Sequence, residues 1–252
     1  MVKYIKKLGW RFKHALTEDC HSSHISALEK IIDPEITNDS FHNDLMRYAG
    51  NTQIKSILEI GSSSGGGSTE AFVTAIRKRD DKALVLLYCI ELSKPRFEQL
   101  CQTYLSDTFV KPYNLSSISS KEFPPESDII AFYQNIPTRL NNAKLKTVLG
   151  WYRAGIDYIR KSNNDQNGIE FIKLDQKIDL FDMVLIDGSE FTGEKELDFL
   201  IGAKVIALDD TETYKCYSAL QRLSNDPDYQ LITYQPNIRN GYAIFAKKDF
   251  SF

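Results

Sequence analysis

Histidine, cysteine and long apolar runs are all scarce in this chain of 252 residues. Its four histidines all lie within the first 42 residues, which disfavours a Cys/His metal site and a Ser-His-Asp hydrolase. Its four cysteines are scattered without CxxC spacing, which indicates a reduced, cytoplasmic protein without a disulfide framework or a zinc site. The longest apolar run, residues 83–90, has the length of a strand, whereas a membrane span needs about 20 residues.

No excess of positive charge marks this protein as one that coats nucleic acid. Its 31 basic and 34 acidic residues give a net charge of −3, so we expect no nucleic-acid partner. Positive charge is concentrated only in residues 1–17, which contain five lysines or arginines and no acid. No apolar region of the kind found in signal peptides follows them, so we expect no signal peptide. A helix over residues 2–16 would face an anionic membrane surface or dock on its own domain; we favour docking.

From residue 55 onward, apolar runs of strand length alternate with helical periods. The predicted strands cover residues 56–60, 84–90, 110–113, 181–186, 204–208, 229–234 and 242–246, and predicted helices cover residues 68–78 and 96–105. This alternation predicts an α/β fold, a Rossmann-like doubly wound sheet that is mostly parallel and covered on both faces. The last two strands are separated only by a Pro/Asn/Gly turn, so they should form a C-terminal antiparallel hairpin.

Two regions interrupt this alternation and suggest how the chain is divided. Residues 1–50 read as a helical N-terminal extension, with one helix over 39–48, and residues 51–252 as the α/β domain. Residues 119–168 read as a helical insertion. One helix face in the insertion carries Leu145, Val148, Leu149, Tyr152, Ile156 and Ile159. Since such an insertion opens at the carboxyl edge of the sheet, it is either a substrate cap or ordinary packing, with about even weight.

The segment ILEIGSSSGGGST, residues 57–69, combines a strand, a glycine-rich turn and a helix start. Glycines let the backbone approach a ligand, and the helix N-terminus supplies free N–H donors. Glu91 ends the next strand, where a carboxylate can accept both hydroxyls of a ribose. This combination indicates an adenosine-containing ligand.

Glu59 decides between two classes of such ligands. A carboxylate at the end of the first strand would repel the pyrophosphate of NAD, which disfavours an oxidoreductase, and would attract the ammonium and sulfonium of S-adenosylmethionine. The segment LEIGSSSG resembles the first motif of class I S-adenosylmethionine-dependent methyltransferases, acidic–x–Gly–x–Gly–x–Gly, with Ser63 at the middle glycine as catechol-type enzymes tolerate. The resemblance covers roughly residues 40–248 and implies that these residues bind the cofactor: Glu59, Gly61, Ser62, Gly65, Ser68, Glu91, Ser116 and Ser117.

Three carboxylates follow the later strands, with Asp187 after one and Asp209 and Asp210 after the next. Neighbouring strands are about 4.8 Å apart, so these like charges converge and need protonation or a cation. Oxygen ligands suit Mg²⁺ or a similar divalent ion, and the resembling metal-dependent O-methyltransferases, catechol-type and sugar-tailoring, carry acids at these strand ends. The alternative is that Asp187 merely ends a strand and that Asp209 or Asp210 caps the helix that follows.

The interpretation is methyl transfer from S-adenosylmethionine to oxygen on a small hydroxylated acceptor, which could include a saccharide, with a divalent cation lowering the pKa of the attacking hydroxyl. Asp187, Asp210 and Lys195 are the candidate catalytic residues. Four residues after the strand ends are candidates for the general base, namely Glu190, Lys195, Tyr214 and Lys215. Two alternatives stay open: a metal-independent methyltransferase and a non-catalytic S-adenosylmethionine-binding scaffold.

Overall fold

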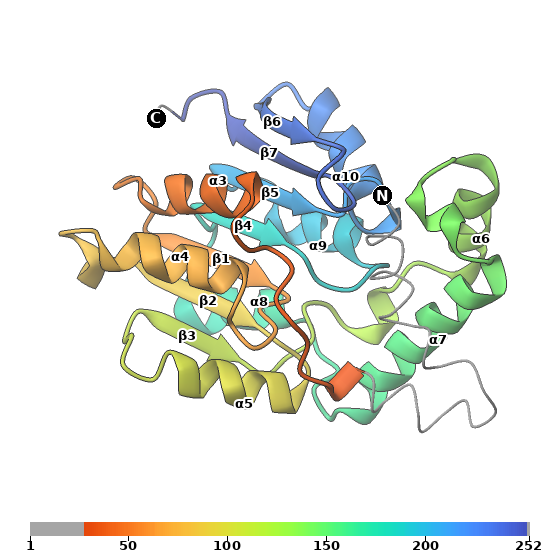
Figure 1. Ribbon diagram of the computed structural model, residues 1–252, viewed down its shortest axis with the longest axis horizontal. Coiled ribbons are helices and arrows are strands. Elements are labelled where there is room, and N and C mark those ends of the chain that lie inside the picture. Colours follow the sequence, from red (N-terminus) through yellow and green to blue (C-terminus); the bar gives the residue numbers. More distant parts are fainter. Residues whose placement is uncertain (1–27, 251–252) are drawn as a thin grey trace.

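The predicted strands assemble into one seven-stranded sheet with the order β3-β2-β1-β4-β5-β7-β6 (Figure 1). The computed structural model describes residues 28–250, so the predicted helix over residues 2–16 lies outside the described residues. The strands are β1 (Ser56–Ile60), β2 (Leu86–Ile90), β3 (Val110–Tyr113), β4 (Met183–Ile186), β5 (Val205–Asp209), β6 (Tyr229–Gln235) and β7 (Tyr242–Lys247). Strands β1 to β5 are parallel, and β7 is antiparallel to both β5 and β6. The predicted Rossmann-like sheet with a C-terminal hairpin is confirmed.

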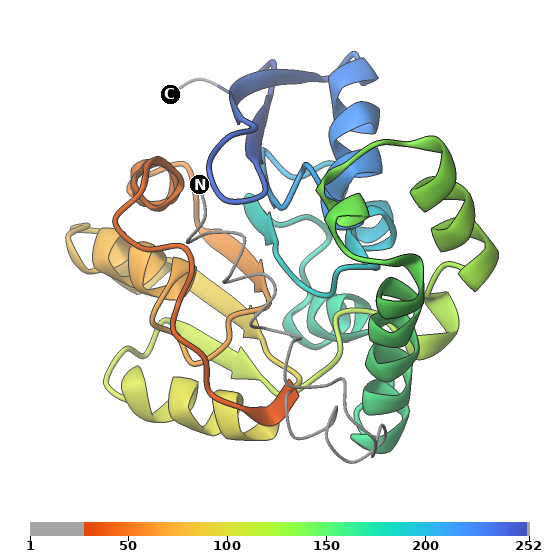
Figure 2. The ribbon, with the colours of Figure 1, turned by 45° about the vertical axis from the view of Figure 1, so that its right-hand side comes forward.

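Helices cover both faces of this sheet (Figures 1 and 2). One face is covered by α3 (Ser40–Ala49), α4 (Ser68–Arg77) and α5 (Lys94–Thr103). The other is covered by α8 (Gly168–Gln176), α9 (Gly193–Leu200) and α10 (Tyr214–Asn225), while α6 (Glu126–Asn135) and α7 (Leu145–Lys161) belong to the same apolar cluster but lie at the edge of the sheet. Successive strand residues point to opposite faces, and in β1 Ile57 packs with the first group of helices while Leu58 packs with the second. Both faces are therefore apolar, which is why the strands read as continuous apolar runs.

Helix α3 is anchored to the C-terminal hairpin. Asp39 caps it by accepting a hydrogen bond from His42 N at 2.8 Å, and the Phe41 ring stacks on Tyr242 with centroids 4.3 Å apart. The Tyr242 hydroxyl also contacts Ser40 Oγ at 2.8 Å and Asp44 Oδ2 at 3.0 Å. The helix predicted over residues 39–48 is thus present and packs into the core, while the division of the chain at residue 50 stays a prediction.

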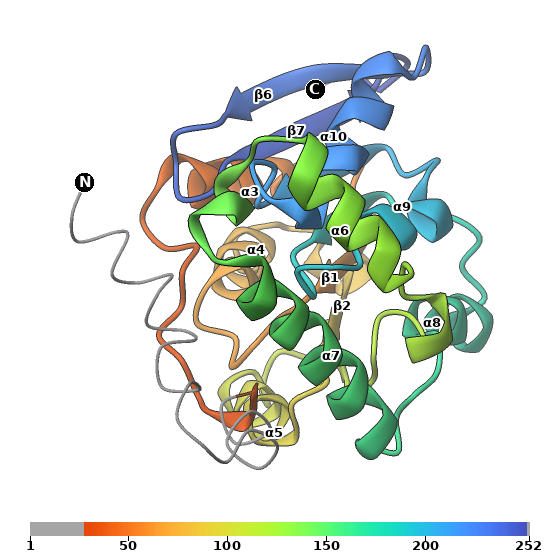
Figure 3. The same cartoon turned by 90° about the vertical axis from the view of Figure 1, so that its right-hand side faces the viewer.

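The insertion is helical, as predicted, and its helices α6 and α7 lie across the carboxyl edge of the parallel strands (Figure 3). Short 3-10 turns, η2 (Ser120–Glu122) and η3 (Arg139–Asn142), precede these two helices. Arg139 ties the insertion to the hairpin because its guanidinium donates to the carbonyl of Pro236 at 2.6 Å and also to that of Arg239. Within the described residues, none of the helices is long and apolar enough to cross a membrane.

We expect Tyr242→Phe to lower the free energy of unfolding by about 1 kcal/mol, because it removes the hydroxyl contacts to α3 while keeping the stacked ring. Tyr234→Phe is the matched control, since that hydroxyl contacts Glu212 on the surface and Tyr234 is 39% exposed; its expected effect is below about 0.5 kcal/mol. Urea unfolding of both variants checks this. Equal effects would show that α3 is not held through the Tyr242 hydroxyl.

Candidate functional site

The turn between β1 and α4 needs glycine at two positions. Gly61 has φ of +86°, and a Cβ there would lie 2.2 Å from the carbonyl oxygen of Asp187. Gly65 has φ of +88°, and its Cβ would lie 2.6 Å from the Tyr104 ring, whose hydroxyl donates to Gly65 O at 2.5 Å. Such left-handed conformations and close approaches exclude larger residues. The turn is therefore held directly against the end of β4.

Glu59 lies below this turn and is fully buried. Its two carboxylate oxygens accept hydrogen bonds from Ser68 Oγ at 2.6 Å and Thr69 Oγ1 at 2.7 Å, both in the first turn of α4. Burial raises the pKa of Glu59, and these hydroxyls oppose that rise. The structure thus joins Glu59 to Ser68, and the carboxylate holds the helix start in place.

Glu91 closes the other side of the turn, at the end of β2. It accepts hydrogen bonds from Ser63 N at 2.8 Å and from Ser93 N at 2.7 Å, and burial raises its pKa while Arg96 opposes the rise. Beside it, in the part of the chain that the structure describes, the buried hydroxyl of Ser63 has no hydrogen-bond partner. Because buried polar groups are normally paired, the Ser63 hydroxyl points to a ligand that completes its hydrogen bonds.

The chain segment that leads into α3 passes over the glycine-rich turn (Figure 2). Pro34 covers the turn, since Cβ atoms on Gly66 and Gly67 would lie 3.3 Å and 3.4 Å from its ring. Farther back, the carbonyl of Lys30 accepts a hydrogen bond from Arg96 Nε at 2.9 Å, in α5. The chain segment before α3 therefore covers the glycine-rich turn and is anchored to α5.

The two serines predicted at the end of β3 are both engaged within the protein. Ser116 Oγ donates to Ile118 O at 2.6 Å, and Ser117 Oγ donates to Glu196 Oε1 at 2.5 Å. Glu196 is fully buried, also accepts from Thr192 Oγ1 at 2.8 Å, and has no partner at Oε2 among the described residues. Burial raises its pKa to about 6. Glu196 was not among the predicted site residues. It follows Lys195 on α9, and a rotation of about 100° per residue turns Glu196 into the core while Lys195 faces outward, so helical periodicity is the signal that could have identified it.

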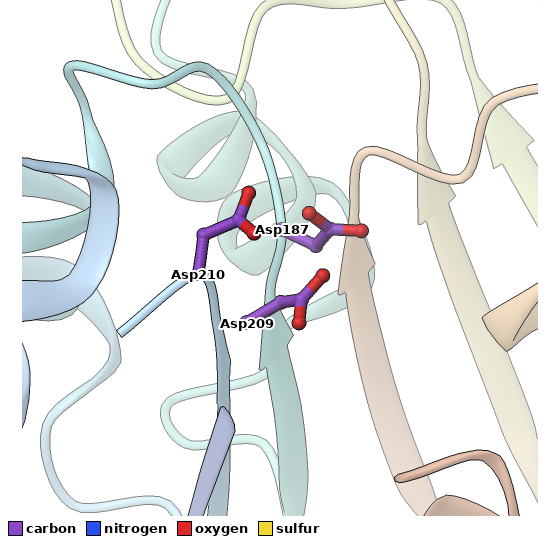
Figure 4. A group of neighbouring side chains, drawn as sticks. All are labelled: Asp187, Asp209 and Asp210. Atoms are coloured by element: carbon purple, nitrogen blue, oxygen red, sulfur yellow. The ribbon is translucent and has the colours of Figure 1, made fainter. Parts of the chain in front are cut away.

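Asp187, Asp209 and Asp210 form the carboxylate cluster, which gathers at the ends of β4 and β5 (Figure 4). One oxygen of each lies within 4.8 Å of the others. The cap positions of the helices that follow are held by Thr192 for α9 and Thr213 for α10. The prediction that Asp209 or Asp210 caps the following helix is therefore wrong, because Thr213 caps α10.

Cationic side chains already contact the carboxylate cluster. Lys215 Nζ lies 2.7 Å from both Asp187 Oδ1 and Asp210 Oδ2, and its side chain is only 5% exposed. Arg239 contacts Asp209 Oδ1 at 2.7 Å, and Asn240 Nδ2 donates to Asp210 Oδ1 at 3.0 Å. Burial alone would lower the pKa of Lys215, but the surrounding carboxylates outweigh it and hold that pKa well above its usual value. Burial likewise raises the pKa of Asp209, with the neighbouring carboxylates adding to the rise.

These contacts bear on the predicted divalent ion. Mg²⁺ requires oxygen ligands at about 2.0–2.1 Å in an octahedron. Here an ammonium bridges two of the three carboxylates and a guanidinium holds the third. The donor set matches a metal site in chemistry, but cationic nitrogens contact all three of its carboxylates, so the residues present do not fit a divalent ion.

The candidate bases differ in their surroundings. Lys195 is half exposed and pairs with Asp198 at 3.4 Å, so the structure does not bring it to the carboxylate cluster. Lys215 reaches the cluster but stays protonated, which makes it a poor base. Glu190 accepts from Tyr214 N at 3.0 Å, and burial raises its pKa to about 7, with Asp210 adding to the rise. Tyr214 packs edge-on against Phe132 with ring centroids 4.8 Å apart, and burial raises its pKa.

Among known proteins, this chain is similar only to solved structures. No protein-family model matches this chain, and no curated protein matches it. A methyltransferase from Geobacter sulfurreducens is 13% identical over 96% of this chain and 97% of its own, with a TM-score of 0.49. An O-methyltransferase from Bacillus cereus in complex with SAH is 12% identical over 98% and 100%, also with 0.49. An SAH-bound methyltransferase from Podospora anserina is 14% identical over 98% and 96%, with 0.46.

Glu196 generates a pH-dependent prediction. Its pKa is about 6 in the folded protein against 4.5 for an unperturbed glutamate, so between these values the folded state keeps a proton that the unfolded state loses. Stability attributable to this group should therefore fall by about 2 kcal/mol as the pH rises from 4 to 7. Glu196→Gln removes the fall, and its stability relative to wild type should improve over that range.

Urea unfolding at pH 4.5, 5.5 and 7 measures this difference, and Glu194→Gln, an exposed position on the same helix, is the control. A difference between Glu196→Gln and wild type that stays constant across the three pH values would contradict the prediction.

Proposed function

We propose that this protein is an S-adenosylmethionine-dependent methyltransferase that acts on a hydroxyl oxygen of a small acceptor. One observation carries the proposal: the glycine-rich turn is held against the carboxylate cluster, since a Cβ on Gly61 would lie 2.2 Å from the carbonyl oxygen of Asp187. A cofactor on the turn and an acceptor at the carboxylates would thus be neighbours, as a direct group transfer requires.

The turn supplies groups suited to this cofactor. Glu91 would accept the ribose hydroxyls, and the unpaired hydroxyl of Ser63 would complete the polar contacts. Glu59 accepts hydrogen bonds at both oxygens, the pattern of an ionised carboxylate. Its charge below the turn favours a sulfonium over the pyrophosphate of a dinucleotide.

Asp187 is the carboxylate best placed to serve the acceptor. Its side chain is 21% exposed, against 9% for Asp210 and 3% for Asp209. In the proposed reaction the acceptor hydroxyl gives its proton to Asp187 as its oxygen attacks the methyl carbon in line with the carbon–sulfur bond. S-adenosylmethionine, held at the glycine-rich turn and by Glu91, would supply the methyl group: as the oxygen–methyl bond formed, the carbon–sulfur pair would return to sulfur and the cofactor would leave as S-adenosylhomocysteine.

We expect S-adenosylhomocysteine at about 100 times its Kd to stabilise the protein by about 2.7 kcal/mol, which corresponds to a rise in Tm of about 5–10 °C. Glu91→Gln should abolish most of this shift because it removes the charge that accepts the ribose hydroxyls. Glu98→Gln, on the exposed side of α5, is the matched control and should keep the full shift. Differential scanning fluorimetry measures all three proteins.

NAD belongs in the same experiment at equal concentration. A shift with NAD and none with S-adenosylhomocysteine would overturn the methyltransferase proposal. A shift with S-adenosylhomocysteine, but no methyl transfer to a panel of polyol, saccharide and phenol acceptors, would instead favour a non-catalytic scaffold.

A further inference from the structure

Lys215 is a buried lysine that contacts the carboxylate cluster and bridges two strand ends. Its ammonium lies 2.7 Å from Asp187 after β4 and 2.7 Å from Asp210 after β5, with 5% of its side chain exposed. A buried ammonium is costly unless carboxylates surround it. Here the ammonium of Lys215 neutralises the carboxylates, and the carboxylates offset the cost of burying the ammonium.

The backbone holds Lys215 in this place. Thr213 caps α10 two residues earlier and accepts from Lys215 N at 3.4 Å. On the opposite side, a Cβ on Gly193 would lie 2.1 Å from the carbonyl oxygen of Lys215, so only glycine lets α9 and α10 approach so closely. The first turn of α10 is therefore fixed between its cap and α9, and its lysine is directed at the cluster.

We propose that Lys215 is the built-in cation of the carboxylate cluster, so that this protein uses a fixed ammonium where the enzymes it resembles use a divalent metal ion. Arg239 neutralises Asp209, and Asn240 donates to Asp210, so every carboxylate of the cluster has a hydrogen-bond donor from the chain itself. This proposal depends on the proposed function in one respect, which is that the acceptor binds at the carboxyl edge of the sheet.

The role of Lys215 follows from its position. As a positioning residue it holds the carboxylates of Asp187 and Asp210 in fixed directions, and its charge offsets the negative charge that an acceptor oxygen develops at this edge. A divalent ion would have to displace it or bind beside a like charge.

Wild-type protein supplies the first test, which needs no variant. The full chain is melted in EDTA and in 5 mM MgCl₂ or MnCl₂, each with and without S-adenosylhomocysteine. We expect metal to shift Tm by less than about 1 °C and to leave the shift from S-adenosylhomocysteine unchanged. A clear metal-dependent shift, or cofactor binding lost in EDTA, would overturn the proposal.

Lys215→Ala supplies the second test, because it leaves the carboxylates without their bridging cation. Its Tm should fall by about 10 °C or more, and Mn²⁺ should restore part of the loss, with an apparent affinity at least about 10-fold tighter than for wild type. Lys204→Ala is the matched control: Lys204 also lies 2.7 Å from an aspartate, Asp182, but is 43% exposed and remote from the cluster. It should lose little stability and gain no affinity for Mn²⁺.

Lys215→Met combined with Asp187→Asn removes one charge of each sign and keeps the test decisive if Lys215→Ala does not fold. We expect the double variant to melt at a higher temperature than Lys215→Met alone. A double variant no more stable than the single one, or a Lys215→Ala protein that folds and gains no affinity for Mn²⁺, would overturn the proposal. Failure of the proposed function has a different signature, since it removes the shift from S-adenosylhomocysteine in wild type and leaves the metal results intact.

Discussion

Three carboxylates converge where β4 and β5 end, and this sheet edge can be buried only because cationic side chains neutralise them. Lys215 reaches the carboxylate cluster from α10, and Arg239 reaches it from the C-terminal hairpin. Arg239 also pairs with Asp39, the cap of α3, and the carbonyl of Arg239 accepts from Arg139 of the insertion. Ion pairs and one side-chain-to-carbonyl hydrogen bond therefore connect this edge to α10, the C-terminal hairpin, the cap of α3 and the insertion.

The backbone shapes the same edge as strongly as the charges do. At Gly61 a Cβ would meet the carbonyl of Asp187, and at Gly193 it would meet the carbonyl of Lys215, at 2.2 Å and 2.1 Å. The first contact sets the distance between the glycine-rich turn and the carboxylate cluster, and the second sets the position of the ammonium. The two carbonyls belong to Asp187, a member of the cluster, and to Lys215, which contacts it, so the proposed reaction geometry depends on two glycines that have no reactive side chain.

Sequence reasoning located the strands well because strands buried on both faces leave continuous apolar runs, and β3 has the predicted bounds. It placed the start of β2 too early, since residues 82–84 form a 3-10 turn in which Leu84 is 69% exposed. The sequence did not reveal which of two lysines, Lys195 or Lys215, reaches the carboxylate cluster. Lys195 and Lys215 both lie in the first turn of a helix that follows a strand, and one residue rotates a helix by about 100°. On α9 this phase turns Lys195 outward, whereas on α10 it turns Lys215 inward.

The antiparallel direction of β7 in the C-terminal hairpin brings a second cation, Arg239, to the carboxylate cluster. Because β7 runs antiparallel beside β5, the turn before it, residues 236–241, must lie at the carboxyl edge. The backbone pairs there as well, with Thr211 N donating to Gly241 O at 3.1 Å, and this brings Arg239 and Asn240 to the cluster. A parallel strand in that position would present its preceding turn at the opposite edge. The reversal of the last strand is therefore what allows Arg239 to neutralise Asp209 and Asn240 to donate a hydrogen bond to Asp210.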